Sequence, residues 1–415
     1  MSKISLLKGL RVRSSLLLCM LLVRMMNMAN KNIICSVMTL LFVWTGVAHA
    51  APVVIPAPPQ LAATAYLLID ADTGKILVEK NADEPVPPAS LTKMLTSYIV
   101  SEEIYEGRLD EQQGIRVSEN AWRKGGAKSG SSTMFLKPNS EVSAVDLLRG
   151  VIIQSGNDAS IALAEHIAGS EESFADIMNQ QAKLLGMNDS HFVNSTGWPA
   201  EGHMTTARDL SVLAKAVIND HPDHYGMYSE RNFEHNGINQ SNRNKLLFSD
   251  RFVDGLKTGH TEEAGYCLVA SAKKEGMRLI SVVMGAKSKS SRATESQRLL
   301  SYGFRYFATH KLYSVGDVLS KTRVWSGENA YVDLTVAEDV IATIPRGSEK
   351  ELVAETQVDK VVKAPLSAGQ ELGRLVIQFD GKELASAPLV AAAAVEQSGF
   401  FARTWDALML MIQGD

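Results

Sequence analysis

Residues 85–100, PVPPASLTKMLTSYIV, combine an apolar helical pattern with a serine and a lysine three positions apart. The apolar side chains recur every three to four residues, which predicts a helix with one buried face. Ser90 stands at the start of this helix, and Lys93 lies among residues that favour burial. A lysine on such a face needs a chemical reason to stay there. The apolar members of the pattern are Leu91, Met94, Leu95, Tyr98 and Ile99.

Ser90 and Lys93 together form a pair suited to nucleophilic catalysis. Side chains three residues apart on a helix project to the same side. A serine in the first turn is close to the positive end of the helix dipole, which stabilises an alkoxide or a neighbouring oxyanion. Burial favours the neutral form of a lysine, and a neutral lysine is a competent base. The Ser-x-x-Lys pattern occurs three times in the chain, so it requires partner motifs before it indicates a site.

One partner motif lies at 152–160, IIQSGNDAS, between two helical patterns. Ser155 and Asn157 flank Gly156 in this short polar break. By itself the tripeptide is typical of an ordinary turn that caps a helix. Its value depends on the motifs that accompany it.

A third motif lies at 254–266, DGLKTGHTEEAGY, just before a strand pattern. We expect Gly259 to let a substrate backbone approach the edge of that strand closely. Lys257 and the Thr258 hydroxyl beside it are suited to hold a carboxylate. The three motifs in this order are far less probable by chance than any one of them, and they form the set that certain penicillin-reactive serine enzymes share.

The order of secondary-structure patterns predicts an α/β (α+β) domain that is interrupted by a helical insert. Residues 65–80 alternate as two strands around an Asp-Thr-Gly turn, and a second strand pair covers 265–286. Helical patterns dominate the chain between them, with Ser143 and Thr205 as expected N-caps. The helical patterns cover 143–154, 158–169, 171–186, 205–220 and 292–310.

Beyond residue 312 the chain consists of short, Val-rich, alternating segments separated by Gly, Pro or charged turns. This texture predicts a small all-β domain over 312–395, after a catalytic domain over 64–310. The tail, 398–415, has an apolar helical face, which favours a membrane-anchoring amphipathic helix. Packing of this helix on its own domain or on a partner helix stays open as the alternative. The face consists of Phe401, Trp405, Leu408 and Ile412.

The first fifty residues have the composition of a signal peptide. They contain six basic residues and no acidic one, and an apolar run ends in Ala48-His49-Ala50. A retained membrane anchor is the alternative, and translation from Met25, Met26 or Met28 would give a signal of ordinary length. The rest of the chain is therefore more acidic than the overall charge of −4, which disfavours nucleic acid as a partner. Removal of this segment leaves Cys267 as the single cysteine, expected to be inert core.

These motifs make the chain resemble the low-molecular-mass penicillin-binding proteins that act as serine-type D-alanyl-D-alanine carboxypeptidases. The likeness runs from about Tyr66 to the last residue and includes YLLIDADTGKILVEKNADEPVPPASLTKM and VDGLKTGHTEEAGYCLVASA. The middle motif reads Ser-Gly-Asn where the set named above has Ser-Asp-Asn, so only its central residue differs. The resemblance implies a β-lactamase/transpeptidase-like catalytic domain, a small all-β C-terminal domain and a membrane-anchoring helix.

The resemblance also implies roles for individual residues. Ser90 would attack the carbonyl between the two terminal D-alanines of a peptidoglycan stem peptide, and Lys93 would accept its proton. The backbone N–H groups of Ser90 and His260 would form an oxyanion hole, with the His260 side chain structural or tuning deacylation. The residues that would relay protons or bind substrate are Ser155, Asn157, Lys257, Thr258, Gly259, Arg243 and Arg292.

For partners and location, the resemblance implies a D-Ala-D-Ala stem peptide, β-lactams as covalent inhibitors and the membrane surface. The expected site of action is the periplasmic face of the bacterial inner membrane. The histidines show no metal-ligand spacing, so we expect neither a metal nor a cofactor. Arg243 and Arg292 could equally be surface charges on helices.

Three other functions share parts of these features. A class A β-lactamase has the same motifs, but this chain lacks a Glu-x-x-Leu-Asn segment and adds a β-domain and a tail. A D,D-endopeptidase stays open, because the motifs do not distinguish a terminal from a cross-linked peptide bond. A catalytically idle wall-binding protein is disfavoured by the intact Ser90, Lys93 and Lys257.

Overall fold

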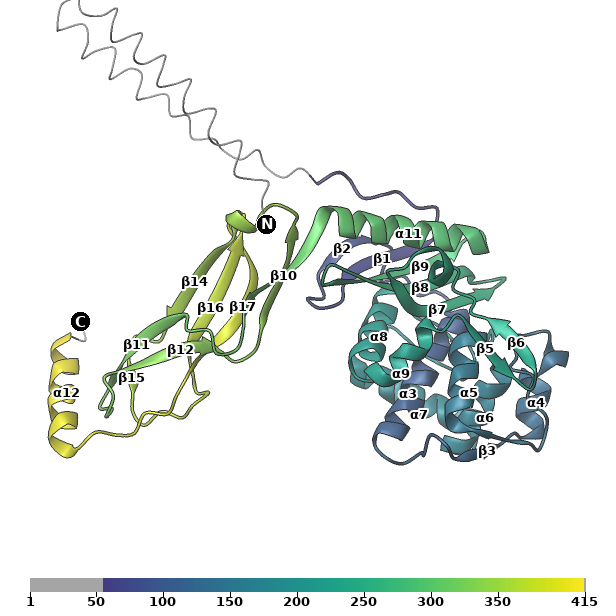
Figure 1. The fold of residues 1–415 in the computed structure, drawn as a ribbon, viewed down its shortest axis with the longest axis horizontal. Helices are drawn as coiled ribbons and strands as arrows, with labels where there is room; N and C mark the ends of the chain where they lie inside the picture. The colour runs from purple at the N-terminus through teal and green to yellow at the C-terminus, as the bar shows by residue number, and fades with distance from the viewer. Residues whose placement is uncertain (1–54, 414–415) are drawn as a thin grey trace, which may run out of the picture. The chain divides into compact units, whose positions relative to one another are not determined.

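The structure is a computed structural model that describes residues 55–413. The expected signal peptide, 1–50, lies outside the described residues. The described chain contains an α/β domain followed by an all-β domain and a terminal helix, in the order expected from the sequence (Figure 1).

A five-stranded antiparallel sheet forms the centre of the first domain, in the order β2-β1-β9-β8-β7. Its halves are far apart in sequence, because the helical insert separates the first two strands from the last three. The strand at one edge, β7, contains the Lys-Thr-Gly motif, which therefore lies within a strand and not just before one. The bounds are β1 Ala65–Asp70, β2 Ile76–Lys80, β7 Val253–Thr261, β8 Gly265–Lys274 and β9 Met277–Ala286.

The two faces of this sheet bury different parts of the chain. Leu67, Ile69 and Val282 pack into the core of the helical insert. Their neighbours Leu68 and Val283 point to the opposite face, where they pack with the long helix α11, Lys289–Tyr306. This alternation is what a strand period of two requires when both faces are covered.

The helical insert holds the elements that carry the first two motifs. A 3₁₀ turn, η1, precedes helix α3, and a π-helical turn, η3, follows helix α5. The pattern at 143–154 is therefore not one regular helix, because the helix widens at Gly150 before the polar break. The main bounds are η1 Ala89–Thr92, α3 Lys93–Tyr105, α4 Glu119–Gly125, α5 Ala144–Arg149, η3 Gly150–Gln154, α6 Asn157–Ala168, α7 Glu171–Leu185 and α8 Ala207–Asn219. Shorter elements are β3 Gly114–Arg116, η2 Ala127–Ser129, β4 Glu141–Ser143, α9 Pro222–Tyr225, η4 Gly226–Ser229, β5 Asn232–His235, β6 Ile238–Ser241 and α10 Leu246–Ser249.

Of the two N-caps expected from the sequence, the structure confirms Ser143 but not Thr205. Ser143 is the N-cap of α5, and its hydroxyl accepts from the Asp146 N–H at 3.3 Å. The N-cap of α8 is Thr206, whose hydroxyl accepts from the Asp209 N–H at 3.0 Å. Thr205 was the wrong residue: its side chain instead bonds the Ser190 hydroxyl. Two adjacent threonines offer the same cap chemistry, and tertiary contacts decide between them.

Replacing Thr206 with alanine is expected to destabilise the protein by about 1 kcal/mol, because the Asp209 N–H loses its acceptor. The measurement is urea unfolding of the purified protein. Thr294→Ala is the matched control, because Thr294 is exposed inside α11 and caps nothing. Equal changes in the two variants would contradict the assigned cap.

The second domain begins earlier than the change in sequence texture suggests. The pattern at 292–310 predicts helix throughout, but α11 ends at Tyr306 and strand β10 begins at Phe307 and pairs with β13. The expected domain boundary at 310–312 thus falls inside β10. A six-stranded sheet, β14-β16-β17-β12-β11-β15, forms the rest. The bounds are β10 Phe307–Tyr313, β11 Ser320–Trp325, β12 Tyr331–Val336, β13 Val340–Pro345, η5 Glu349–Glu351, β14 Val353–Val358, β15 Val362–Lys363, β16 Glu371–Phe379 and β17 Lys382–Ala391.

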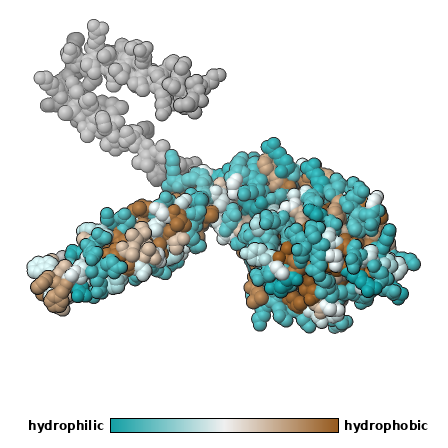
Figure 2. Space-filling model, turned by 60° about the horizontal axis from the view of Figure 1, so that its bottom comes forward, coloured by the Kyte–Doolittle hydropathy of each residue, from teal (hydrophilic) through white to brown (hydrophobic). Residues whose placement is uncertain are grey.

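The tail forms helix α12, Phe400–Gln413, as its pattern predicts. One polar side contacts the β-domain: Asp406 accepts from the Ser326 N–H at 2.7 Å and lies 3.5 Å from the Arg323 guanidinium. The apolar face points to solvent, with Phe401 88% and Trp405 64% exposed. Figure 2 shows apolar side chains gathered at the end of the β-domain where Figure 1 places α12. Over residues 55–413, no helix is both long and apolar enough to cross a membrane.

Candidate active site

The serine and the lysine of the opening motif lie where two elements join. Ser90 belongs to the 3₁₀ turn η1, and Lys93 is the first residue of α3. Lys93 Nζ lies 3.2 Å from Ser90 Oγ and donates to the Thr196 carbonyl at 2.5 Å. The Lys93 side chain is buried, with a residue exposure of 1%. Lys93 therefore stays on the buried face because it is paired with Ser90.

Burial, assisted by the positive charge of Arg243, lowers the pKa of Lys93 to about 7. The carboxylates of Glu171 and Asp158 act in the opposite direction. At neutral pH a large share of the Lys93 amines is therefore unprotonated. In that form the Ser90 O–H can donate to the Nζ lone pair over the same 3.2 Å, which is the geometry a general base needs.

The middle motif brings a third polar side chain into the same cavity. Ser155 follows the π turn and has a left-handed backbone, with φ of 61°. Its hydroxyl is buried and has no hydrogen-bond partner among the residues that the structure describes. A buried hydroxyl without a partner is available to a substrate or to a transferred proton. Asn157 opens helix α6, and its N–H donates to the Ser132 carbonyl at 2.8 Å.

A cavity of about 590 Å³ connects these residues with the third motif. Lys257 is buried beside it, and burial together with the charges of Lys93, Arg243 and Arg292 lowers the pKa of Lys257 well below its usual value. The guanidinium groups of Arg243 and Arg292 line the cavity, and with the Lys257 amine buried beside it they favour an anionic ligand such as a carboxylate. The predicted site residues that line the cavity are Ser90, Ser155, Asn157, Arg243, Thr258, Gly259, His260 and Arg292.

Both arginines line this cavity, although Arg243 is itself exposed and lies in the loop before α10 rather than on a helix. Arg292 extends from α11 and is buried, and its Nη1 donates to the Gly259 carbonyl at 2.8 Å. Burial lowers the pKa of Arg292 to about 10. Arg243 lies at the cavity and donates from Nε to the Gln154 carbonyl at 3.1 Å. Each guanidinium is thus tied to the backbone of a different motif.

Gly259 is needed for a reason that differs from the one expected. A Cβ at this position would lie 3.0 Å from the Pro88 carbonyl oxygen and 3.2 Å from the Ala89 Cβ. The close neighbour is therefore the protein's own turn η1, which carries Ser90, and not only a substrate at the strand edge. A glycine lets β7 approach the nucleophile turn.

The His260 side chain is exposed and turned toward its own hairpin. Its ring stacks on Tyr266 with centroids 3.8 Å apart, and Nδ1–H donates to the Gly265 carbonyl at 3.0 Å. This arrangement agrees with a structural reading of the imidazole. It leaves Lys93 as the base beside Ser90.

The loop that holds Lys93 was not identified from the sequence. Asn194 Oδ1 accepts from the N–H groups of Thr196, Gly197 and Trp198 at 3.2, 2.8 and 3.1 Å. This turn places the Thr196 carbonyl on Lys93 and brings Trp198 to the cavity wall. The Asn and Gly residues in NSTGW (194–198) indicate a turn. The contact with Lys93 could not be predicted, because every residue type has a backbone carbonyl.

Asp158 is a second missed residue, directly after the Ser-Gly-Asn motif. Its carboxylate is fully buried and accepts from the Thr133 hydroxyl and from three backbone N–H groups. The distances are 2.7 Å to Thr133 Oγ1, 2.8 Å to Met134 N, 3.0 Å to Leu136 N and 3.0 Å to Ala159 N. Asp158 therefore ties the segment that includes Ser132, which lines the cavity, to helix α6.

The variant Asp158→Asn is expected to destabilise the protein by about 3 kcal/mol, because its NH₂ group faces two donors in either orientation. Acylation at Ser90 should slow as well, since the cavity wall loses its anchor. Asp176→Asn is the control, because Asp176 is exposed on α7. The measurements are thermal unfolding and penicillin labelling. If the two variants had the same melting temperature and labelling rate, the assigned role of Asp158 in holding residues 133–136 against α6 would be contradicted.

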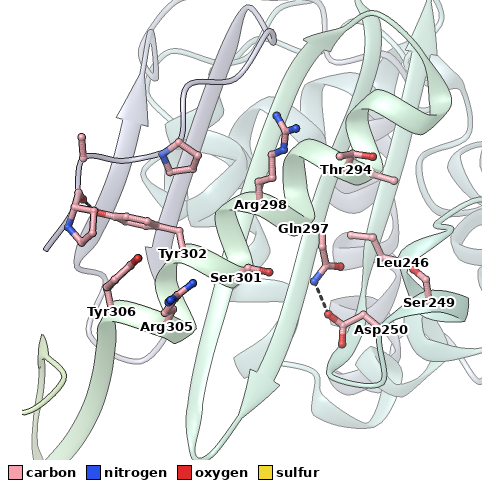
Figure 3. A pocket seen from close by; sticks show the side chains of 14 residues that line it. Leu246, Ser249, Asp250, Thr294, Gln297, Arg298, Ser301, Tyr302, Arg305 and Tyr306 are labelled. Atoms are coloured by element: carbon pink, nitrogen blue, oxygen red, sulfur yellow. Dashed lines mark hydrogen bonds between the residues drawn. The ribbon is translucent and has the colours of Figure 1, made fainter.

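A larger cavity of about 800 Å³ lies along α11 (Figure 3). Gln297 donates to Asp250 there at 2.7 Å, and the Tyr302 O–H donates to the Pro56 carbonyl at 2.9 Å. Its lining includes hydroxyls but no lysine or histidine base beside them, so we assign the reaction to the smaller cavity. Cys267 is buried, and burial raises the pKa of its thiol to about 11. Within residues 55–413 no three His, Cys, Asp or Glu side chains group as metal ligands.

Comparison with known proteins gives matches over both domains. The family described as D-alanyl-D-alanine carboxypeptidase matches residues 52–288. The family described as penicillin-binding protein 5, C-terminal domain, matches residues 307–397. The D-alanyl-D-alanine carboxypeptidase DacC of Escherichia coli (strain K12) is 45% identical, over 89% of this chain and 93% of that protein.

Solved structures agree with the sequence matches. The structure of penicillin binding protein 5 from Haemophilus influenzae has a TM-score of 0.78 and 42% identity, and it covers 82% of this chain and 100% of that chain. Penicillin-binding protein D2 from Listeria monocytogenes, solved in its ampicillin-bound form, has a TM-score of 0.52 and 30% identity. That match covers 60% of this chain and 100% of that chain.

Proposed function

The chain belongs to the D-alanyl-D-alanine carboxypeptidase family, and from this premise we propose how its residues release the terminal D-alanine of a peptidoglycan stem peptide. It is a serine-type peptidase. The observation that carries the mechanism is the buried Lys93 amine, with its lowered pKa, 3.2 Å from Ser90 Oγ at a cationic cavity.

Acylation begins when neutral Lys93 accepts the Ser90 proton. Ser90 Oγ then forms a bond to the carbonyl carbon between the two D-alanines, and the carbonyl oxygen becomes an oxyanion. The N–H groups of Ser90 and His260 bind that oxygen, a contribution of about 3 kcal/mol for each donor. The tetrahedral intermediate collapses as the bond to the D-alanine nitrogen breaks.

The leaving amine takes up a proton as it departs. Lys93 holds the proton removed from Ser90, and the Ser155 hydroxyl, which has no partner among the described residues, is suited to relay it. Asn157 lies at the same cavity and can hold the substrate amide. Water then attacks the ester on Ser90, which releases the shortened stem and restores the serine.

The terminal carboxylate of the substrate is matched by the charge of the site. Lys257 and the Thr258 hydroxyl lie on the edge strand β7, and Arg243 and Arg292 line the same cavity. A bound carboxylate would favour the charged form of Lys257, whose pKa is lowered by burial and by the neighbouring cationic groups. This preference selects peptides whose free carboxylate belongs to the D-alanine directly after the cleaved bond.

β-Lactams fit the same constellation, because they carry a carboxylate beside a strained amide that Ser90 can open. Ampicillin bound to the Listeria relative supports this proposal. We expect covalent attachment at Ser90 and slow release.

The test gives the purified protein a pentapeptide ending in D-Ala-D-Ala, a cross-linked muropeptide dimer and a fluorescent penicillin. We expect release of D-alanine from the pentapeptide, inhibition by penicillin, and a mass increase on the peptide that contains Ser90. Cleavage of the dimer alone would replace this function with an endopeptidase activity. Rapid turnover of penicillin would favour a β-lactamase, and the absence of labelling would rule out the serine mechanism.

We further propose that the enzyme acts on the periplasmic face of the inner membrane and is held there by α12. The support is the exposed apolar face of this helix and the contact of Asp406 with the β-domain on another side. The signal-peptide pattern of residues 1–50 supports export.

Replacing Trp405 with glutamate is expected to weaken vesicle binding at least tenfold, because a charge replaces a large ring that would insert into the membrane surface. Co-sedimentation with phospholipid vesicles measures the effect. Ala407→Glu is the matched control, because it adds the same charge to α12 outside the apolar face. Similar losses in both variants, or none in either, would remove the support for this anchor.

A further inference from the structure

Ser90 follows a residue with an unusual backbone. Ala89 is buried and has φ of +48°, a left-handed conformation that residues other than glycine rarely adopt. Such a conformation persists only where surrounding contacts hold it. The contacts at the Ala89 carbonyl therefore bear directly on the nucleophile.

A buried hydrogen-bond chain ends on that carbonyl. The Thr92 hydroxyl donates to the Ala89 oxygen at 2.9 Å, and Thr92 Oγ1 lies 2.8 Å from His203 Nε2. Because the single hydroxyl proton is used on Ala89, Thr92 must accept from His203 Nε2–H. Thr92 is fully buried and His203 is 3% exposed, so water does not compete for these bonds.

The second ring nitrogen of His203 fixes its tautomer. The Val193 N–H donates to His203 Nδ1 at 3.1 Å, so Nδ1 carries no proton and Nε2 does. Burial lowers the pKa of His203 to about 4, and nearby His191 and Lys93 act in the same direction. The imidazole is thus a neutral, oriented donor throughout the pH range in which Lys93 titrates.

The hydrogen bonds from His203 through Thr92 to the Ala89 carbonyl also constrain the orientation of the Ser90 N–H. The Ala89 carbonyl and the Ser90 N–H belong to one planar, trans peptide group, so they point in opposite directions. Whatever fixes the carbonyl also fixes the direction of the N–H. Under the function proposed above, that N–H is one of the two oxyanion donors.

We propose that His203 is a positioning residue for acyl transfer: through the Thr92 hydroxyl it fixes the peptide plane that aims the Ser90 N–H at the oxyanion. Its loop also supplies the Thr196 carbonyl that holds Lys93. The same loop therefore positions both the base, Lys93, and the oxyanion donor, the Ser90 N–H. This inference rests on the proposed function only for the identity of the oxyanion donor.

The test uses His203→Phe, Thr92→Val, the double variant and Thr92→Ser. Phenylalanine keeps the ring that packs edge-on against Phe192, with centroids 5.6 Å apart, but removes both hydrogen bonds. We measure penicillin acylation at about pH 8, where Lys93 is mostly neutral, and kcat and KM on the pentapeptide. Each single variant is expected to lower acylation and kcat by roughly 10- to 100-fold with little change in KM.

Two features separate positioning from general loss of structure. The double variant should be no slower than the slower single variant, because both residues act in series. Thr92→Ser should recover most of the rate, because it restores the hydroxyl. His221→Phe is the matched control: His221 is also buried, bonds Glu102 at 2.9 Å and does not line the cavity, so its loss should leave acylation unchanged.

Wild-type acylation in His203→Phe, or rates that fall multiplicatively in the double variant, would overturn the inference. So would an equal fall in His221→Phe. A wild-type protein that binds penicillin covalently but releases no D-alanine would fail the proposed carboxypeptidase function. In that case the acylation rates of the variants would still test whether His203 positions the Ser90 N–H.

Discussion

Replacing Lys93 with methionine is expected to lower the rate of acylation at Ser90 by roughly 10³-fold, because the reaction loses its general base. Methionine is similar in length and is apolar, so the buried position remains filled. The change also removes a group whose charged form is desolvated, and we therefore expect no loss of thermal stability below pH 7. A large fall in rate in a stably folded protein distinguishes catalysis from support of the fold.

The pH dependence of wild-type acylation tests the same assignment. Only the neutral Lys93 amine can accept the Ser90 proton, so the rate should rise with pH and reach half its limit near the Lys93 pKa of about 7. Below that pH the rate should fall about tenfold for each pH unit. The residual rate of Lys93→Met should lack this transition, with Ser90→Ala as the blank. A transition at the same pH in the variant would assign the base to another group.

The sequence was sufficient to predict the elements whose pattern is local. The Ser90–Lys93 pair depends on three-residue spacing at a helix start, and the hairpin of β1 and β2 depends on alternation around a turn. Both follow from contacts between near neighbours in the chain. The predicted family is confirmed by the two domain matches.

The features that could not be predicted depend on contacts between distant segments. The Thr196 carbonyl reaches Lys93 across 103 positions of sequence, and any residue type supplies a carbonyl. Asp158 was visible in the sequence, but its function as a clamp depends on where residues 133–136 pass. Gly259 was expected to let a substrate backbone approach, which stays a prediction, and the structure shows instead that turn η1 lies close to it.

The helix boundaries that the sequence placed wrongly have related causes. The amphipathic pattern of α11 continues past Tyr306, but pairing of β10 with β13 uses Phe307–Tyr313 as a strand. The apolar spacing over 143–154 is regular, yet the helix widens at Gly150 before Ser155 turns into the cavity. In both places tertiary contacts override a local periodicity.

The variant Gly197→Ala is expected to lower acylation at least 100-fold and to destabilise the protein by about 2–4 kcal/mol. Gly197 has φ of +79°, and an added Cβ would lie 1.8 Å from the Ala89 oxygen and 2.9 Å from Thr92 Oγ1. No small shift relieves such an overlap, because the first of these atoms is backbone. Either the loop that carries the Thr196 carbonyl or turn η1, which carries Ser90, must move.

Gly202→Ala separates this overlap from simple backbone strain. Gly202 has a similar φ of +75°, but its added Cβ would meet only His191 Nδ1, at 3.9 Å. Its expected cost is therefore that of the left-handed conformation, about 1 kcal/mol, with acylation within a few-fold of wild type. Urea unfolding and penicillin acylation, measured on both variants, give the comparison. Acylation that is equally fast in Gly197→Ala and Gly202→Ala would show that the contact between this loop and the Ala89 carbonyl does not set the geometry of Ser90.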